Sequence, residues 1–262
     1  MSDAQVGAAR PEPDARLPNT DELGPAIALD KREPKLLRLF KLVAAAAAMA
    51  VSSGVLGLLT MMLVGIVFGR TAGGGFEVRS WAAIAIGQLL LGAFALWRSQ
   101  KRFGPGWHTA IGLRSVALDR RLAGRVVLAV ALYWSWAALV ISVAGLSGRL
   151  KGLPDIVPNS AAALAAFTMT AVVLAPLCEE AFFRGYVQTR AQAFLSPAVS
   201  VALPAFLFAL AHFSGNVAQP AVVFMLGVLA GHLRRASGSL VPGIILHALN
   251  NGCLVLLVTL AR

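Results

Sequence analysis

The residues in this sequence that could do chemistry are polar groups embedded in apolar segments. Glu179, Glu180 and Arg184 lie within six residues, directly after the stretch 160–178, whose one ionisable side chain is the thiol of Cys178. A charged group near the middle of a bilayer costs about 2.5–3.5 kcal/mol on insertion scales. Three such groups in so short a segment therefore indicate a functional site or a buried polar network.

Two later apolar segments add two imidazoles and an amide. His212 ends the run Phe208-Ala-Leu-Ala-His212, and His247 opens the run His247-Ala-Leu-Asn-Asn251. A carboxylate in apolar surroundings has a raised proton affinity, which suits Glu179 to take a proton from water. His212 could hold that water, while His247 and Asn251 stabilise the negative charge that develops on a peptide carbonyl. Peptide hydrolysis is the chemistry that this set predicts.

The spacing along the chain predicts how these side chains meet. The sequence midpoint of Glu179 and His212 is 195.5, beside Ser196-Pro197, where we expect a turn between two antiparallel helices. At 1.5 Å per residue both would lie about 25 Å from that turn, and therefore at one depth. His247 and Asn251 are four residues apart, so they share one helix face, above a second turn expected near Ser237-Gly238.

Glu180 and Arg184 are also four residues apart, in the order that favours an ion pair on a helix. Glu179 is rotated by about 100° from Glu180 around the same helix. We therefore assign Glu180 and Arg184 a structural, orienting role as a buried ion pair. Glu179 is left as the free acid or base.

A metal site is an alternative interpretation of the same residues. Glu179, His212 and His247 would supply one carboxylate and two imidazoles and leave a fourth position for water, as in catalytic zinc sites. The sequence has no His-Glu-x-x-His pattern that would hold two ligands on one helical turn. We therefore expect no required cofactor and a metal-free site, with Zn²⁺ as the alternative.

Composition indicates a membrane protein. Of the 262 residues, 58% are hydrophobic and only 13% are charged, against about 25% charged in soluble domains. The net charge of +11 does not indicate a nucleic-acid partner, because the basic residues collect between apolar segments, as in cytoplasmic loops. The expected partners are the lipid bilayer and a membrane-embedded or membrane-associated peptide substrate.

The apolar segments predict an all-α, polytopic bundle of about seven transmembrane helices, with the catalytic core in the last four. Each span needs about 20 apolar residues. The expected spans are about 42–68, 81–97, 126–146, 160–182, 198–213, 217–233 and 241–260, with the fourth helix continuing to about Leu195.

Three regions follow from this pattern. Residues 1–35 are polar and interrupted by prolines, which is typical of a disordered cytoplasmic tail. Residues 36–150 hold the amino-terminal helices and a basic loop, and residues 151–262 hold the protease core. Basic clusters before the first span, after the second and before the seventh all fall on one side, so the amino terminus is predicted to be cytoplasmic in a multi-pass protein of the cell membrane.

The three motifs resemble those of the CAAX-processing and bacteriocin-processing intramembrane protease family. That family includes the type II CAAX prenyl endopeptidases and the lysostaphin-resistance-like proteins of bacteria. Its motifs Glu-Glu-x-x-x-Arg, Phe-x-x-x-His and His-x-x-x-Asn correspond here to Glu179–Arg184, Phe208–His212 and His247–Asn251. The resemblance covers about residues 160–255 and implies packed transmembrane helices, a water-activating glutamate and an endopeptidase of a class often described as metalloproteases. Specificity for prenylated substrates is not implied, because the family's substrates vary.

Two other classes of protein could carry this polar set. A transporter or scaffold could use it as an ion pathway or a structural network. A non-proteolytic immunity or partner-binding protein is the third class, although such a protein would be free to lose Glu179 or His212. A comparison of membrane proteomes with and without Glu179 discriminates these classes.

Overall fold

The computed structural model describes residues 33–68, 78–117, 119–146, 158, 160–213 and 217–260, and within them the regular secondary structure is entirely helical. The predicted all-α fold class is confirmed. The helices are α2 (Lys35–Phe68), α3 (Val78–Phe103) with the short turns η1 (Gly104–Gly106) and α4 (Trp107–Ala110), α5 (Arg120–Leu146), α9 (Pro197–Ala211), α10 (Ala218–Ser237) and α11 (Val241–Leu260).

Between α5 and α9 lies one continuous helix, Ala161–Gln192, which we call the central helix. It consists of α6 (Ala161–Thr168), η2 (Met169–Leu174), α7 (Ala175–Glu180), η3 (Ala181–Val187) and α8 (Gln188–Gln192). The fourth helix therefore continues beyond the expected span, as predicted. It ends at Gln192, three residues before the expected end at Leu195.

Three helical stretches in the described residues are long and apolar enough to cross a membrane: Val78–Ala110, Arg120–Gly145 and Ala161–Gln192. Pro197–Ala211 and Val241–Leu257 are shorter apolar helices. The chain is therefore a membrane protein, while the count of seven spans stays a prediction. The predicted disordered tail falls, up to residue 32, outside the described residues.

Local sequence signals explain where several helices begin and end. Asp119 accepts a hydrogen bond from the Leu122 N–H at 2.7 Å and caps α5, and Ser160 accepts from the Ala163 N–H at 3.1 Å and caps α6. Pro197 is the first residue of α9, where its missing N–H costs nothing. Gly238 ends α10 with a φ of 65°, a left-handed conformation that glycine adopts readily. The two turns predicted at 196–197 and 237–238 are confirmed.

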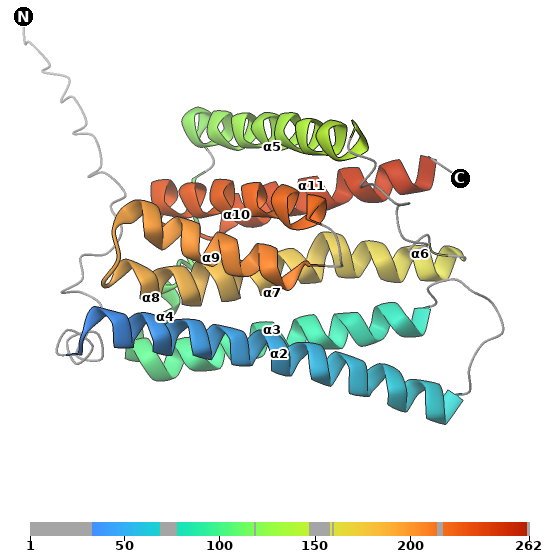
Figure 1. The fold of residues 1–262 in the computed structure, drawn as a ribbon, viewed down its shortest axis with the longest axis horizontal. Helices are drawn as coiled ribbons and strands as arrows, with labels where there is room; N and C mark the ends of the chain where they lie inside the picture. Colours follow the sequence, from blue (N-terminus) through green and yellow to red (C-terminus); the bar gives the residue numbers. More distant parts are fainter. Residues whose placement is uncertain are drawn as a thin grey trace, which may run out of the picture.

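The helices lie side by side with their long axes roughly parallel (Figure 1). α5 lies on one outer face and α2 on the opposite one, with the central helix between them. α3, α9 and α11 all contact the central helix. Large apolar side chains are exposed on the outer helices, for example Leu63 on α2, Leu128 on α5 and Leu257 on α11. So much exposed apolar surface is the expected exterior of a protein that contacts lipid.

α10 packs closely on α9 through two glycines. A Cβ atom at Gly227 would come within 2.8 Å of Ala205, and one at Gly231 within 2.9 Å of Val201. In lipid, where apolar side chains gain little by leaving the solvent, such close approach supplies van der Waals contact between helices. The Gly-x-x-x-Gly pattern of α10 therefore serves packing within the chain.

The basic residues that predicted the orientation lie at one end of the bundle. In Figure 1 that end holds the starts of α2 and α5 and the ends of α3, α8 and α10. The described basic residues in these places are Lys35, Arg38, Lys41, Arg98, Lys101, Arg102, Arg120, Arg121, Arg125, Arg190, Arg234 and Arg235. The predicted assignment of this end to the cytoplasm agrees with the positive-inside rule and stays a prediction.

Candidate active site

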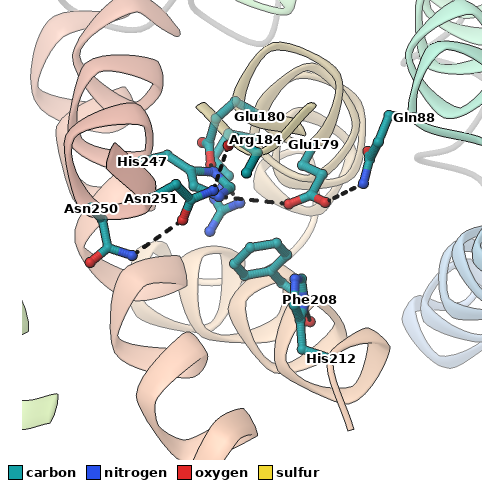
Figure 2. A network of polar contacts seen from close by, with 10 residues as sticks. Gln88, Glu179, Glu180, Arg184, Phe208, His212, His247, Asn250 and Asn251 are labelled. Atoms are coloured by element: carbon teal, nitrogen blue, oxygen red, sulfur yellow. Dashed lines mark hydrogen bonds and ion pairs between the residues drawn. The ribbon is translucent and has the colours of Figure 1, made fainter. Parts of the chain in front are cut away.

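The motif residues meet in the interior of the bundle, where the central helix lies between α3, α9 and α11 (Figure 2). Glu179 and Glu180 are the last two residues of α7, a short α-helical segment between the π-helical segments η2 and η3. π-helical turns within α-helices are rare and often mark functional sites. Here they flank the two adjacent carboxylates.

Pro176 explains why the first π-helical segment, η2, accepts a hydrogen bond from α11. The Ala175 N–H donates to the Thr170 carbonyl, five residues back, and Pro176 has no N–H to donate. The Ala171 carbonyl is thus left without the donors four and five residues ahead. The amide of Asn251 fills this position, since its Nδ2 donates to Ala171 O at 2.7 Å. A neighbouring helix re-satisfies a carbonyl freed by proline, as expected for a transmembrane segment.

Glu180 and Arg184 form the expected ion pair, and neither side chain is exposed. Arg184 NH1 donates to Glu180 Oε1 at 2.9 Å. Two glycines leave room for the pair, because a Cβ at Gly243 would lie 3.1 Å from Glu180 Oε2 and one at Gly227 would lie 3.1 Å from Arg184 NH2. The guanidinium carbon also lies 4.6 Å from the centre of the Phe208 ring, within cation–π range.

Glu180 has a second contact that the sequence did not predict. His247 Nδ1 lies 3.1 Å from the same oxygen, Glu180 Oε1. A carboxylate can only accept, so the Nδ1 of His247 carries the proton in this contact. Glu180 therefore holds the imidazole of α11 in one orientation and one tautomer, with Nε2 on the opposite side of the ring.

Glu179 faces the other nitrogen of His247. Glu179 Oε2 and His247 Nε2 are 3.8 Å apart, beyond direct hydrogen-bond distance. Glu179 Oε2 is buried and has no hydrogen-bond partner in the described part of the chain. A water oxygen about 2.8 Å from both atoms would see them at an angle of about 85°, so one water beside the gap can contact both.

The other oxygen of Glu179 is held from α3. Gln88 Nε2 donates to Glu179 Oε1 at 2.8 Å (Figure 2). Gln88 is not among the predicted site residues, although the sequence carries a signal for it, since it is the one polar side chain in the expected span 81–97. Polar residues in a membrane segment are costly and are by default candidates for a functional site.

His212 lies near these groups without a direct polar contact to them. It is the residue that follows α9, is half-buried, and its Nδ1 lies 2.8 Å from the Phe208 carbonyl oxygen. Among the described residues no hydrogen bond or ion pair joins His212 to Glu179. The Phe208 ring contacts both imidazoles, with ring centres 4.6 Å from His212 and 5.7 Å from His247. The shared water of Glu179 and His212 stays a prediction.

The predicted register of the first helical hairpin agrees with one ring contact. Phe183 and Phe208 have the same sequence midpoint, 195.5, as Glu179 and His212, and their ring centres lie 5.0 Å apart. Asn250, which the sequence analysis did not single out, is also buried in the site. Its Nδ2 contacts Asn251 Oδ1 at 3.4 Å, so both polar atoms of the Asn251 amide have partners.

The alternative metal site does not fit this arrangement. Within the described residues, no group of three or more His, Cys, Asp or Glu side chains could hold a metal ion. Glu179 and His247 lie together, but no polar contact joins His212 to either of them, so the three expected ligands do not converge on one point among the described residues. We therefore derive no catalytic step through a metal.

The comparisons with known proteins give one match. Residues 161–253 match the family model described as type II CAAX prenyl endopeptidase Rce1-like. No curated protein and no solved structure matches the chain. The matched segment, less than half of the chain, runs from the start of the central helix into α11 and contains all three motifs. Residues 161–253 are therefore similar to the Rce1-like domain of type II CAAX prenyl endopeptidases.

Proposed function

We propose that the protein is a multi-pass intramembrane endopeptidase that hydrolyses a peptide bond with water activated by Glu179. One observation carries the proposal. The buried Glu179 Oε2 has no hydrogen-bond partner among the described residues and lies 3.8 Å from an imidazole nitrogen whose ring is oriented by Glu180. An unpaired carboxylate oxygen beside an oriented imidazole is an arrangement that binds and deprotonates water.

The proposed reaction uses one water molecule, and Glu179 carries one proton from that water to the leaving nitrogen. Glu179 takes a proton from the water, and the hydroxide oxygen forms a bond to the carbonyl carbon of the substrate. The tetrahedral intermediate collapses as Glu179 returns the proton to the leaving nitrogen, and the C–N bond breaks. The products are a carboxylic acid and an amine, which become a carboxylate and an ammonium when the acid proton passes to the amine, and Glu179 is regenerated as a carboxylate.

The developing oxyanion requires hydrogen-bond donors. Asn251 has two amide protons, of which one is committed to Ala171 O, so one remains available. His247 is the second candidate donor, when its Nε2 is protonated. A single oxyanion donor of this kind contributes about 10²–10³-fold to the rate. His212, on the other side of the Phe208 ring, is proposed to contact the same water once the substrate is bound.

The proposed substrate is a membrane-associated or lipidated peptide. The site lies among helices whose outward faces are apolar, so a substrate segment anchored in the bilayer can approach from the lipid. The family description names CAAX prenyl endopeptidases, which makes a prenylated carboxyl-terminal peptide the first candidate.

The test has two stages and one matched control. Membrane proteomes of cells carrying the wild-type protein or Glu179→Gln should differ in new peptide termini. The purified proteins are then assayed with an internally quenched peptide, farnesylated on a cysteine four residues from its carboxyl terminus, and with the same peptide lacking the lipid. We expect Glu179→Gln to lower the cleavage rate at least about 10²-fold while the protein still inserts and stays folded.

The control is Glu33→Gln, the same substitution at a glutamate that pairs with Lys41 at the start of α2, away from the site. It should cleave at the wild-type rate. Cleavage by purified Glu179→Gln at the wild-type rate would remove Glu179 from the mechanism. Identical proteomes, with neither peptide cleaved, would favour a transporter, a scaffold or a non-proteolytic immunity protein.

A further inference from the structure

We infer that α3, which lies outside the matched segment 161–253, completes the active site, with Gln88 as the residue that positions Glu179. This inference rests on the proposed function for its catalytic consequence, although its structural part does not. Helix α3 contacts both α7 and η3, so the carboxylates lie against it. The domain that the family model matches is thus incomplete without a helix from the amino-terminal half.

Gln88 fixes which oxygen of Glu179 is available. The contact of 2.8 Å joins Gln88 Nε2 to Glu179 Oε1. A carboxylate accepts and an amide nitrogen donates, so this pairing defines the orientation of the Gln88 amide. With Oε1 held from α3, the unpaired Oε2 is the oxygen that faces His247. Without Gln88, the carboxylate could rotate about its terminal torsion, which is broad and roughly two-fold.

A glycine one turn further along α3 explains how the helix comes close enough. Gly92 lies four residues after Gln88, so the two share one face of α3. A Cβ atom at Gly92 would come within 2.8 Å of Cys178 Sγ, and Cys178 directly precedes Glu179. The absence of a side chain at Gly92 therefore lets α3 approach α7 closely enough for the Gln88 amide to reach Glu179.

The amide oxygen of Gln88 supports a role beyond packing. Gln88 Oε1 is buried and has no hydrogen-bond partner among the described residues. An unpaired buried acceptor is costly unless a partner arrives during function. Beside the catalytic base, that partner would be a hydrogen of the reacting water or an N–H of the bound peptide.

The first experiment tests the approach of α3 to α7 without any activity assay. In Gly92→Cys, the new Cβ would lie 3.2 Å from Cys178 Cβ, just below the range of disulfides. The atom nearest to it, Cys178 Sγ at 2.8 Å, is the one that turns to form the S–S bond, so the link needs a shift of only a few tenths of an ångström. A membrane-permeable oxidant, such as copper phenanthroline, should link residues 92 and 178 in membranes, as detected by mass spectrometry of the joined peptides. The double variant Gly92→Cys/Cys178→Ala is the control and should not form a link to the exposed Cys253. A missing 92–178 link would overturn the inference whatever the protein's function.

The second experiment measures catalysis with the quenched peptide that the wild type cleaves. Gln88→Leu removes both amide atoms and keeps similar volume. We expect kcat to fall by about 10- to 100-fold, since a misplacement of about 1 Å can cost 10²-fold, while KM changes less than about two-fold. Gln100→Leu is the matched control, because Gln100 is an exposed glutamine on the same helix.

A structural role for Gln88 would give a different pattern. If Gln88 only stabilised the fold, Gln88→Leu would lower the thermal midpoint and the amount of active protein, with kcat per folded molecule unchanged.

A double variant adds a further check. In Glu179→Asp the shorter carboxylate is out of reach of α3, so adding Gln88→Leu should lower kcat less than about two-fold further. An unchanged kcat in Gln88→Leu, or full additivity in the double variant, contradicts the positioning role.

If the 92–178 link forms and no peptide is cleaved by the wild type, the structural part of the inference stands and the proposed function fails. If the wild type cleaves and the link does not form, the proposed function stands and the inference fails. The two experiments therefore separate the two proposals.

Discussion

At the scale of single residues, the two adjacent glutamates have different surroundings. Glu180 has its Oε1 shared between Arg184 and His247 and is fully buried. Each glutamate has its Oε2 without a hydrogen-bond partner among the described residues, but the Oε1 of Glu179 accepts only from the neutral amide of Gln88 and forms no ion pair with an arginine there. Identical side chains can take different roles when their environments differ in this way. The environment of Glu180 supports an orienting role, and that of Glu179 supports the role of base.

The imidazole of His212 gives a prediction at this scale. We expect His212→Ala to abolish cleavage, with a loss of about 10²-fold or more in kcat, if it contacts the reacting water as proposed. The protein should keep its stability, because His212 lies at the end of α9 and is only half-buried. His232→Ala, at an exposed histidine of α10, is the matched control in the quenched-peptide assay. A normal kcat in His212→Ala would leave His247 as the one imidazole in the mechanism.

At the scale of helices, the buried ion pair links the central helix to α11. Glu180 and Arg184 belong to the central helix, and the shared oxygen of Glu180 also holds His247. Breaking such a pair leaves one uncompensated charge in the interior. The ion pair and the orientation of the His247 imidazole therefore depend on the same side chain, Glu180.

Arg184→Ala tests this arrangement. It leaves Glu180 buried and unpaired by arginine, at a cost of about 3–5 kcal/mol in the free energy of unfolding. We expect loss of membrane yield and of thermal stability together with loss of cleavage. Arg121→Ala, at an exposed arginine of α5, should leave both unchanged. Normal thermal stability of Arg184→Ala would show that the pair is solvated, and its orienting role would be dropped.

At the scale of the whole molecule, the site is assembled from four regions of the chain. α3 supplies Gln88, the central helix supplies the carboxylates, α9 supplies Phe208 with the adjacent His212, and α11 supplies His247 and Asn251. Small residues let these helices approach one another: Gly92 between α3 and α7, and Gly227 between α10 and α9. The polar groups therefore meet because the helices around them are closely packed.

The last prediction concerns metal dependence. Within the described residues, Glu179 and His247 lie together and no third ligand of the kind that a zinc site requires joins them. We therefore expect exhaustive chelation of the purified protein to leave cleavage of the quenched peptide intact, with no stoichiometric zinc by elemental analysis. One zinc per chain, lost together with activity in Glu179→Gln, would overturn this expectation and make the protein a zinc enzyme.

The amino-acid sequence is sufficient to predict the helices and the ion pair between Glu180 and Arg184. Apolar length, with Pro197 at a helix start and Gly238 at a helix end, predicted the helices to within several residues, because these signals act within one segment. The four-residue spacing of Glu180 and Arg184 predicted their ion pair for the same reason, since helical geometry alone brings them together.

Only the tertiary structure decided which groups from different helices meet. His247 rather than His212 lies beside Glu179, Glu180 holds its Nδ1, and Gln88 reaches the base from α3. Such contacts depend on the rotation and the separation of neighbouring helices. These are set by small residues and by the π-helical turns around Pro176, which no spacing along the sequence encodes.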